Sequence, residues 1–345
     1  MSNSIPKFPH HQIVKSTNHQ IFKSSHQSMK FRTEVEIPNS GKKIETDDRV
    51  FSIGSCFATE MTNLLKAGQL QTLNNPFGTL FNPFSINNAV KKIHNAALYT
   101  EEDLVSFGED VLSLDHHSSF NSRFVHQTLE KINGQIENAN QFLQQTNWVL
   151  VTYGTSFIYD FLPKKKLVAN CHKIPAKYFE KRLLTHLELT DSIYETVENL
   201  KDIAKENVQI LFTVSPVRHT KDGMVENNLS KSKLITAIHE ILPQFENCHY
   251  LPVYEILMDD LRDYRFYKED LIHPNNQAIN YIWEKFGNAY FSNETMDFIE
   301  ENLKIAKSLD HRSFDENSPK YREFAEKLSQ RIAAQQKKVK HKIFF

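Results

Sequence analysis

Short, continuous apolar runs alternate with longer segments of helical periodicity along most of the chain. The runs are RVFSIG (49–54), WVLVTYGT (148–155), VQILFTVSP (208–216), CHYLPVYEI (248–256) and a weaker LQTLNNP (70–76). Between them, apolar residues recur at helical spacing over 57–68, 84–97, 127–146, 190–206, 229–242 and 275–291. Strands that are apolar throughout are buried on both faces, and helices of this length connect parallel strands. The pattern therefore predicts an α/β fold with a parallel sheet of about five strands between two layers of helices.

The composition divides the chain into three parts. Residues 1–45 are polar with only short apolar pieces, so we expect an N-terminal arm. Residues 46–292 hold the alternating elements and form the predicted α/β domain, with a hairpin inserted over 157–170. Residues 293–345 are charged and helical in pattern. We expect them to form a C-terminal extension that is solvated, packs on the domain or pairs with a second copy.

Charge balance and the lack of long apolar segments exclude several functions. Lys and Arg number 41 against 42 Asp and Glu, so we expect no nucleic-acid partner. No stretch reaches the roughly 18 apolar residues of a membrane span, and the first residues resemble no secretion signal, so we expect no membrane partner. The three cysteines, Cys56, Cys171 and Cys248, fit neither a disulfide framework nor a zinc site and suit a reducing compartment. A soluble cytoplasmic protein is the expectation.

Small and polar residues gather where the predicted strands end. In an open parallel sheet, ligands bind beyond the carboxyl ends of the strands. In chain order these ends carry Gly54-Ser55-Cys56, then Asn75 and Gly78, then Gly154-Thr155-Ser156, then Ser215 to His219, and finally Asp270 and His273. We therefore expect a functional site to be assembled from these five segments at one edge of the sheet.

Asp270 precedes His273 by three residues, and Pro274 then opens a predicted helix. A carboxylate at this spacing accepts a hydrogen bond from one ring nitrogen and leaves the other nitrogen to act as a general base. Taken alone, the pair also fits an ordinary helix cap with an exposed histidine.

Cys56 is predicted at the first turn of a helix, after a glycine that permits a tight turn. Unpaired N–H groups and the helix dipole favour a thiolate there, and a neighbouring imidazole favours it further. We therefore expect the pKa of the thiol to lie below about 8.5. We also expect the sulfur to lie about 3–4.5 Å from an imidazole nitrogen of His273. A buried structural cysteine is the alternative for Cys56, and it is our interpretation of Cys171 and Cys248.

Three separated blocks resemble the GSCFA family, which is named after the first of them: FSIGSCFATEM (51–61), NPFGTLFNPFSI (75–86) and YRFYKEDLIHP (264–274). The resemblance covers roughly residues 30–290. It implies a domain similar to the SGNH-hydrolase superfamily, which holds esterases, lipases and carbohydrate deacetylases on a flavodoxin-like three-layer α/β/α fold. The implied strand order is 2-1-3-4-5. The family supplies a fold and a site, but no substrate.

The superfamily's catalytic blocks match this sequence in part. Gly-Asp-Ser, whose Ser is the nucleophile, falls on Gly54-Ser55-Cys56, so Cys56 stands at the nucleophile's position. The oxyanion-hole glycine of the second block matches Gly78, and the Asn of the third block falls on Ser156. The last block, Asp-x-x-His-Pro, matches Asp270–Pro274 without departure. A cysteine nucleophile also occurs in a similar capsule-biosynthesis acyltransferase family of this fold, whose motif is Gly-Asn-Cys.

The resemblance and the residues together predict a hydrolase that acts on an acyl ester or thioester. Cys56 would attack the acyl carbonyl, His273 would take and return the proton, and Asp270 would orient His273. The N–H groups of Cys56 and Gly78, with the Ser156 side chain, would stabilise the oxyanion. This chemistry needs no cofactor, and the expected partner is a small-molecule or carbohydrate acyl ester.

Three alternatives stay open. An acyltransferase of the same fold would pass the acyl group to an alcohol, using coenzyme A or a similar thioester as donor. A non-catalytic binding module would keep the fold and a ligand pocket, which the altered first and third blocks favour. Ser55 could be the nucleophile in place of Cys56, but it lies one residue early, so its side chain would point away.

Further residues are candidates for substrate binding because they lie at or near the same strand ends. They are Ser55, Asn75, Gly154, Thr155, His117, Arg218 and His219. His117 lies in LSLDHHSSF (112–120), but adjacent histidines seldom share one ion, so we predict no metal site. Arg218 could bind an anionic group through two parallel hydrogen bonds. A solvated surface position is the alternative for Arg218.

Overall fold

The computed structural model describes residues 32–38, 41–310 and 319–344, so most of the arm predicted over 1–45 lies outside the described residues. The chain divides into two compact units, Met1–Thr33 and Glu34–Phe345. The second unit contains all the helices and strands named below.

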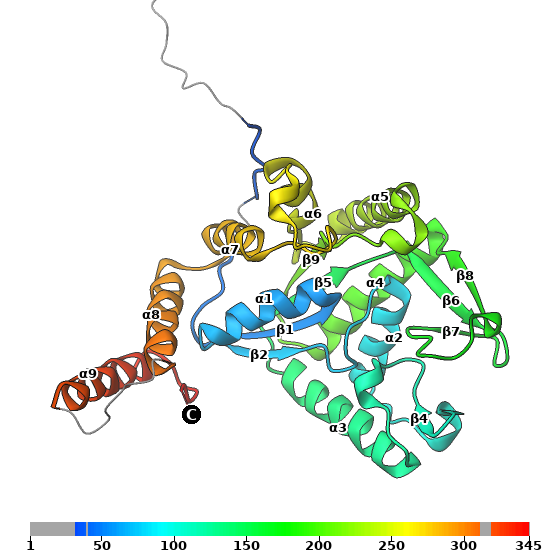
Figure 1. The fold of residues 1–345 in the computed structure, drawn as a ribbon, viewed down its shortest axis with the longest axis horizontal. Coiled ribbons are helices and arrows are strands. Elements are labelled where there is room, and N and C mark those ends of the chain that lie inside the picture. The colour runs from blue at the N-terminus through cyan, green and yellow to red at the C-terminus, as the bar shows by residue number, and fades with distance from the viewer. Residues whose placement is uncertain (1–31, 39–40, 311–318, 345) are drawn as a thin grey trace, which may run out of the picture. The chain divides into compact units, whose positions relative to one another are not determined.

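A parallel five-stranded sheet forms the centre of this unit. Its strands are β1 (Arg49–Gly54), β2 (Gln71–Asn74), β5 (Trp148–Tyr153), β9 (Gln209–Val214) and β10 (Cys248–Tyr250). Their spatial order is β10-β9-β5-β1-β2, and each neighbouring pair is parallel (Figure 1). Counted along the chain, this is the order 2-1-3-4-5. The predicted flavodoxin-like α/β/α fold is confirmed.

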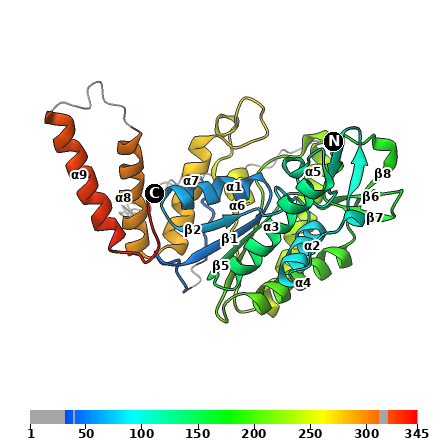
Figure 2. The same cartoon turned by 90° about the horizontal axis from the view of Figure 1, so that it is seen from below.

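The helices cover both faces of the sheet. They are α1 (Cys56–Ala67), α2 (Pro83–His94), α3 (Val125–Leu143), α4 (His186–Ile203), α5 (Met224–Ile241), the one-turn α6 (Val253–Glu255), α7 (Asn276–Tyr290), α8 (Asn293–Leu309) and α9 (Pro319–Gln336). Helices α2, α3, α4 and α5 pack on one face, whereas α1 and α7 pack on the other (Figure 2).

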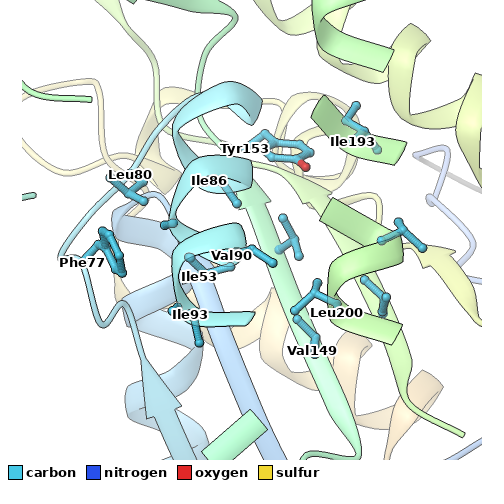
Figure 3. Close-up of a cluster of buried hydrophobic side chains, with 14 of the residues drawn as sticks. Ile53, Phe77, Leu80, Ile86, Val90, Ile93, Val149, Tyr153, Ile193 and Leu200 are labelled. Carbon is cyan, nitrogen blue, oxygen red and sulfur yellow. The ribbon is translucent and has the colours of Figure 1, made fainter. Parts of the chain in front are cut away.

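Successive residues of a strand point to opposite faces, and the two cores follow this alternation. Phe51 and Ile53 of β1 pack among α2, α3 and α4, and Figure 3 shows Ile53 beside Val90 and Val149 beside Leu200. Val50 of the same strand packs instead with α1 and α7. Both faces of β1 are thus buried, which explains its continuous apolar sequence.

Two small antiparallel units lie outside the main sheet. β3 (Val105–Phe107) pairs with β4 (Asp110–Leu112). β6 (Phe157–Phe161) pairs with both β7 (Lys166–Val168) and β8 (Phe179–Leu183). The hairpin predicted over 157–170 is therefore present, with β8 as a third strand that the sequence did not indicate.

The strand predicted over 248–256 is wrong in its second half. β10 ends at Tyr250, α6 begins at Val253, and a π-helical turn, Ile256–Asp260, follows. Pro252 separates the two conformations, with φ at −79°. Proline has no N–H for a sheet, and its fixed φ suits the position before a helix. The apolar run therefore continues through a change of secondary structure.

Helix α8 and the described residues of the C-terminal segment that follows pack against the end of α1 that is away from Cys56. Asn302 of α8 donates its side-chain N–H to the Gly68 carbonyl at 3.0 Å. The His341 ring binds the Gln69 carbonyl at 2.7 Å, and helix α9 is joined to α8 by an ion pair between Arg331 and Glu301. Among the described residues, no helix is both long and apolar enough to cross a membrane.

β1 ends closer to β5 than a side chain would permit. Gly54 has φ of +139°, and a Cβ there would lie 2.1 Å from the Thr152 carbonyl oxygen. The next N–H, from Ser55, donates to that same oxygen at 3.0 Å, and the Gly54 N–H donates to Asn75 Oδ1 at 2.7 Å. These contacts fix the turn from which α1 starts. Glycine is required there both for its φ and for the close approach.

Gly54→Ala should destabilise the fold by about 2 kcal/mol or more, because the new Cβ meets backbone and the φ is strained. Gly134→Ala is the matched control, since a Cβ at Gly134 in α3 meets nothing within 4 Å. A glycine-to-alanine change inside a helix should raise stability by about 0.5–1 kcal/mol. Urea unfolding midpoints measure both. A Gly54→Ala protein as stable as the Gly134→Ala protein would contradict this account of the turn.

Candidate functional site

The predicted site segments meet at the carboxyl edge of the sheet. Cys56 opens α1 directly after β1, and Gly154 follows β5. The Gly54 carbonyl accepts the Leu80 N–H at 3.0 Å, and the Phe81 carbonyl accepts the Gly154 N–H at 2.7 Å. These bonds join the segments that follow β1, β2 and β5.

The loop that carries His273 is joined to the same edge. The Arg218 N–H, after β9, donates to the Ile272 carbonyl at 3.3 Å. Tyr267 forms an isolated bridge with Pro274, and the Lys268 N–H donates to the His273 carbonyl at 2.8 Å. The base predicted at His273 therefore lies on a loop connected to the β9 end.

Asp270 and His273 form the predicted pair. Nδ1 of His273 lies 2.7 Å from Asp270 Oδ2, and Oδ1 accepts the backbone N–H groups of Ile272 (2.9 Å) and His273 (3.0 Å). The two backbone N–H groups, with the ring, lower the pKa of Asp270 to about 2. The carboxylate is therefore ionised at neutral pH and fixes the ring. In the described part of the chain Nε2 has no hydrogen-bond partner, so it is free to accept a proton.

Cys56 is a free, partly buried thiol at the N-terminus of α1. Burial raises the pKa of the thiol, while the backbone N–H groups of Cys56 and Phe57 and the charge of Lys231 oppose the rise. The expectation of a lowered pKa is therefore wrong, because desolvation of the thiolate outweighs the helix N-terminus. Cys56 and His273 are both described by the structure, and no hydrogen bond joins Cys56 Sγ to the His273 ring.

Lys231 is the residue of this edge that we did not predict. Its side chain, on α5, is 1% exposed, and Nζ donates to the carbonyl oxygens of Gly154 (2.7 Å) and Ser215 (2.6 Å). Within the described residues it has no carboxylate partner. Burial lowers the pKa of Lys231 to about 7, and the nearby Cys56 thiolate opposes this shift. A lysine inside an amphipathic helix is usually solvent-exposed, so no local sequence pattern predicted that Lys231 would be buried.

Ser230, the neighbour of Lys231 on α5, forms hydrogen bonds with Thr155 and Ser156, two of the residues predicted from the third block. Its Oγ accepts the Ser156 N–H at 2.7 Å and lies 3.2 Å from Ser156 Oγ and 2.9 Å from Thr155 Oγ1. Ser156 is fully buried. The Phe81 carbonyl takes the N–H groups of both Gly154 and Thr155. In this structure Ser156, Gly154 and Thr155 hold the strand ends together, and none offers an unpaired donor to an oxyanion.

The backbone N–H of Gly78 also takes part in a turn. Its N–H donates to the Asn75 carbonyl at 2.7 Å, so it is not an unpaired oxyanion donor. A Cβ at Gly78, where φ is +74°, would lie 2.2 Å from the Cβ of His117. The exposed His117 is thus brought beside the β2 end. The Asn75 side chain accepts the Gly54 N–H and donates to Thr59 Oγ1 at 3.0 Å, so it connects β1 with α1.

Ser55 and Cys56 are adjacent but differently placed. Ser55 is 1% exposed, and a Cβ at Gly154 would lie 3.4 Å from its Cβ. Its Oγ is buried with no partner among the described residues. The side chain of Ser55 therefore points into the protein, and Cys56 is the more accessible of the two side chains.

Arg218 and His219 follow β9. The Arg218 guanidinium lies 4.2 Å above the ring centre of Tyr267 and 5.3 Å from that of Tyr264. His219 meets the Phe81 ring edge to face at 5.5 Å, and burial lowers its pKa to about 4. His219 is therefore neutral at neutral pH. Among the described residues, no group of three or more His, Cys, Asp or Glu side chains is placed to hold a metal ion.

The chain belongs to the GSCFA family. The model of the GSCFA family matches residues 49–286, and that of the GSCFA domain protein, C-terminal domain, matches residues 303–342. No curated protein matches the chain.

Two solved structures are similar to the chain at low identity. One is a DUF4886 family protein from Bacteroides uniformis ATCC 8492, with 11% identity and a TM-score of 0.38 over 85% of this chain and 97% of that one. The other is a carbohydrate esterase family 3 from Talaromyces cellulolyticus, with 9% identity and a TM-score of 0.34 over 74% of this chain and 99% of that one. Likeness at these scores does not bear on activity.

Alkylation of Cys56 by iodoacetamide should be slow at neutral pH and rise only above the pH of an ordinary thiol, because burial raises its pKa. Lys231→Met should leave this midpoint nearly unchanged, because Lys231, with a pKa of about 7, is mostly neutral at the alkaline pH where the thiol ionises. Lys233→Met is the control on the same helix, where Nζ binds the Leu184 carbonyl. Peptide-resolved mass spectrometry separates Cys56 from Cys171. A wild-type midpoint at or below that of a free thiol would refute the raised pKa.

Lys231 should also make stability depend on pH. Its pKa of about 7 when folded lies below the 10.5 of an unperturbed lysine, so between these values the unfolded chain binds the proton and the folded chain does not. The free energy of unfolding therefore rises with pH across this window, by up to about 1.4 kcal/mol per pH unit. Urea unfolding at pH 7 and about pH 9.5 should show this rise in wild type and Lys233→Met. It should be smaller in Lys231→Met, and equal slopes would contradict the assignment.

Proposed function

We propose that the protein is an SGNH-like hydrolase of acyl esters or thioesters, with Cys56 as nucleophile, His273 as general base and Asp270 as the residue that orients it. The observation that carries the proposal is the 2.7 Å bond between Asp270 and the His273 ring, at the sheet edge where the partly buried thiol lies. Membership of the GSCFA family and its resemblance to the SGNH superfamily support the same reaction class.

The raised pKa of Cys56 determines how the reaction begins. The thiol is protonated at neutral pH, so His273 must take its proton as the sulfur attacks the acyl carbon. This resembles the action of a serine hydrolase more than that of a preformed thiolate–imidazolium pair. Hydrogen bonds between base and nucleophile are often long before substrate binds, and they tighten in the complex.

Attack produces a tetrahedral oxyanion next to the start of α1. The N–H groups of Cys56 and Phe57, in the first turn, together with the α1 dipole, are the donors that remain for it. His273 returns the proton to the leaving alcohol or thiol, and a thioester on Cys56 remains. Water then attacks the thioester with His273 as base, which releases the acid and restores the thiol.

A binding module is the second candidate, and one observation favours it. Ser156, at the position of the superfamily's oxyanion-hole Asn, is fully buried and bonded to Ser230. A site with fewer donors stabilises an oxyanion less. An acyltransferase would use the same first half of the reaction and differ only in whether water or an alcohol accepts the acyl group.

We propose a cytoplasmic location for this reaction. The three cysteines are free, and a nucleophilic thiol needs a compartment that keeps it reduced. A small-molecule or carbohydrate acyl ester is the proposed substrate, and no cofactor takes part.

A screen of short-chain p-nitrophenyl esters and acyl thioesters tests the proposal. Cys56→Ala should abolish turnover, and His273→Ala should reduce kcat by about 10²-fold or more. Asp270→Asn should lower it through loss of ring orientation. Cys171→Ala is the matched control and should keep full activity. Turnover by Cys56→Ala equal to wild type would remove the assignment, and no turnover of any ester by folded wild type would favour the binding module.

A further inference from the structure

A pocket of about 160 Å³ lies beside the loop that carries His273. It is lined by Arg218, Leu257, Met258, Leu261, Arg262, Asp263, Tyr264 and Tyr267. All but Arg218 come from the segment between α6 and His273, which is yellow in Figure 1. No residue of the pocket is among those matched to the superfamily's catalytic blocks.

The pocket wall is bonded to the residues that flank the base. Arg218 donates its N–H to the carbonyl of Ile272, which precedes His273. Tyr267 bridges to Pro274, which follows His273. The pocket wall is therefore bonded to both residues that flank His273 in the sequence.

One side of the pocket is apolar and the other is cationic. Leu257 and Leu261 are 1% and 2% exposed and pack with Tyr267. Arg218 and Arg262 supply two guanidinium groups. Across the described residues neither arginine has an ion pair with a carboxylate.

Asp263 is the carboxylate among the residues that line the pocket, and Arg265 already binds it. Asp263 Oδ1 accepts the Arg265 N–H at 2.9 Å, and its Oδ2 lies 3.7 Å from Arg265 Nε. The pocket therefore keeps a net positive charge. The Arg218 guanidinium carbon lies 4.2 Å from the ring centre of Tyr267, a cation–π contact that holds the cation at the pocket wall, where its N–H groups can bind a bidentate anion.

We infer that this pocket binds an anionic group, a carboxylate or a phosphate, carried on the aliphatic part of the ester substrate. The Arg218 edge binds the anionic oxygens, and the Leu257–Leu261 side contacts the aliphatic chain. This inference rests on the proposed function for the identity of the molecule as a substrate, but the pocket's affinity for anions does not depend on catalysis.

Two esters of equal acyl length test the specificity. Wild type should have a higher kcat/KM for mono-p-nitrophenyl glutarate than for p-nitrophenyl valerate, since only the first carries a carboxylate. Arg218→Gln should lower kcat/KM for the glutarate ester by about tenfold or more and leave the valerate ester within about twofold. Lys221→Gln is the control, because it removes an equal charge from an exposed position of the same loop. Equal losses on both esters would mean that Arg218 only supports the loop, and would overturn the inference.

Binding without turnover separates this inference from the proposed function. Calorimetric titration with glutarate and with inorganic phosphate should give saturable binding to wild type and Lys221→Gln, and none to Arg218→Gln. If no ester is hydrolysed but this pattern holds, the pocket stands and the hydrolase does not. The preferred probe distinguishes a carboxylate from a phosphate ligand. If Arg218→Gln fails to fold, Arg262→Gln, at an exposed position, replaces it. Absence of binding to wild type, or equal binding to all variants, would overturn the inference.

Discussion

The close approach of β1 to β5 at Gly54 is the contact on which the rest of this edge depends. With no Cβ, Gly54 lets the Ser55 N–H reach the Thr152 carbonyl, and the chain turns directly from a buried strand into α1. This turn places Cys56 in the first helical turn and buries the Ser55 side chain beneath it. Asn75 then ties the end of β2 to the same glycine. Cys56, the proposed nucleophile, is therefore positioned by backbone contacts of the core and not by a long loop.

The Lys231 ammonium performs a second task at the same edge. It joins the ends of β5 and β9 through the Gly154 and Ser215 carbonyls, yet burying a cation without a carboxylate partner is unfavourable. The lowered pKa of Lys231 expresses that cost, and a negative charge on Cys56 would offset part of it. Negative charge that develops on the sulfur or on a nearby oxyanion is therefore stabilised in part by Lys231, although burial of Cys56 still raises the pKa of its thiol. A residue assists catalysis when it stabilises the charge that develops in the transition state more than it stabilises the ground state.

The sequence predicted the sheet well because the signals were local. β1 ends at Gly54 as predicted, since the apolar run and the glycine coincide there. The strand over 248–256 was only half right, because Pro252 changes the backbone while the apolar pattern continues. Of the site, the sequence predicted the pair that depends on local spacing: Asp270 and His273 are hydrogen-bonded as expected. The Gly78 N–H and the Ser156 hydroxyl were predicted to be oxyanion donors, but Asn75 accepts the first and Ser230 the second, through tertiary contacts that no local pattern reveals. The pKa of Cys56 was misjudged for the same reason, because burial is a property of the whole fold.

His273, the proposed base, and Cys56, the proposed nucleophile, are held in position in different ways. The hydrogen bonds that the Asp270 side chain accepts come from Ile272 and His273, so the geometry of the pair is made within the loop itself. The loop's position relative to Cys56 depends instead on its attachment to the β9 end, where Arg218 binds the Ile272 carbonyl. The same arginine rests on Tyr267, so one residue connects the position of the base with the cationic wall of the pocket. An anionic substrate bound as proposed would therefore contact the residue whose backbone N–H holds the loop of the proposed base.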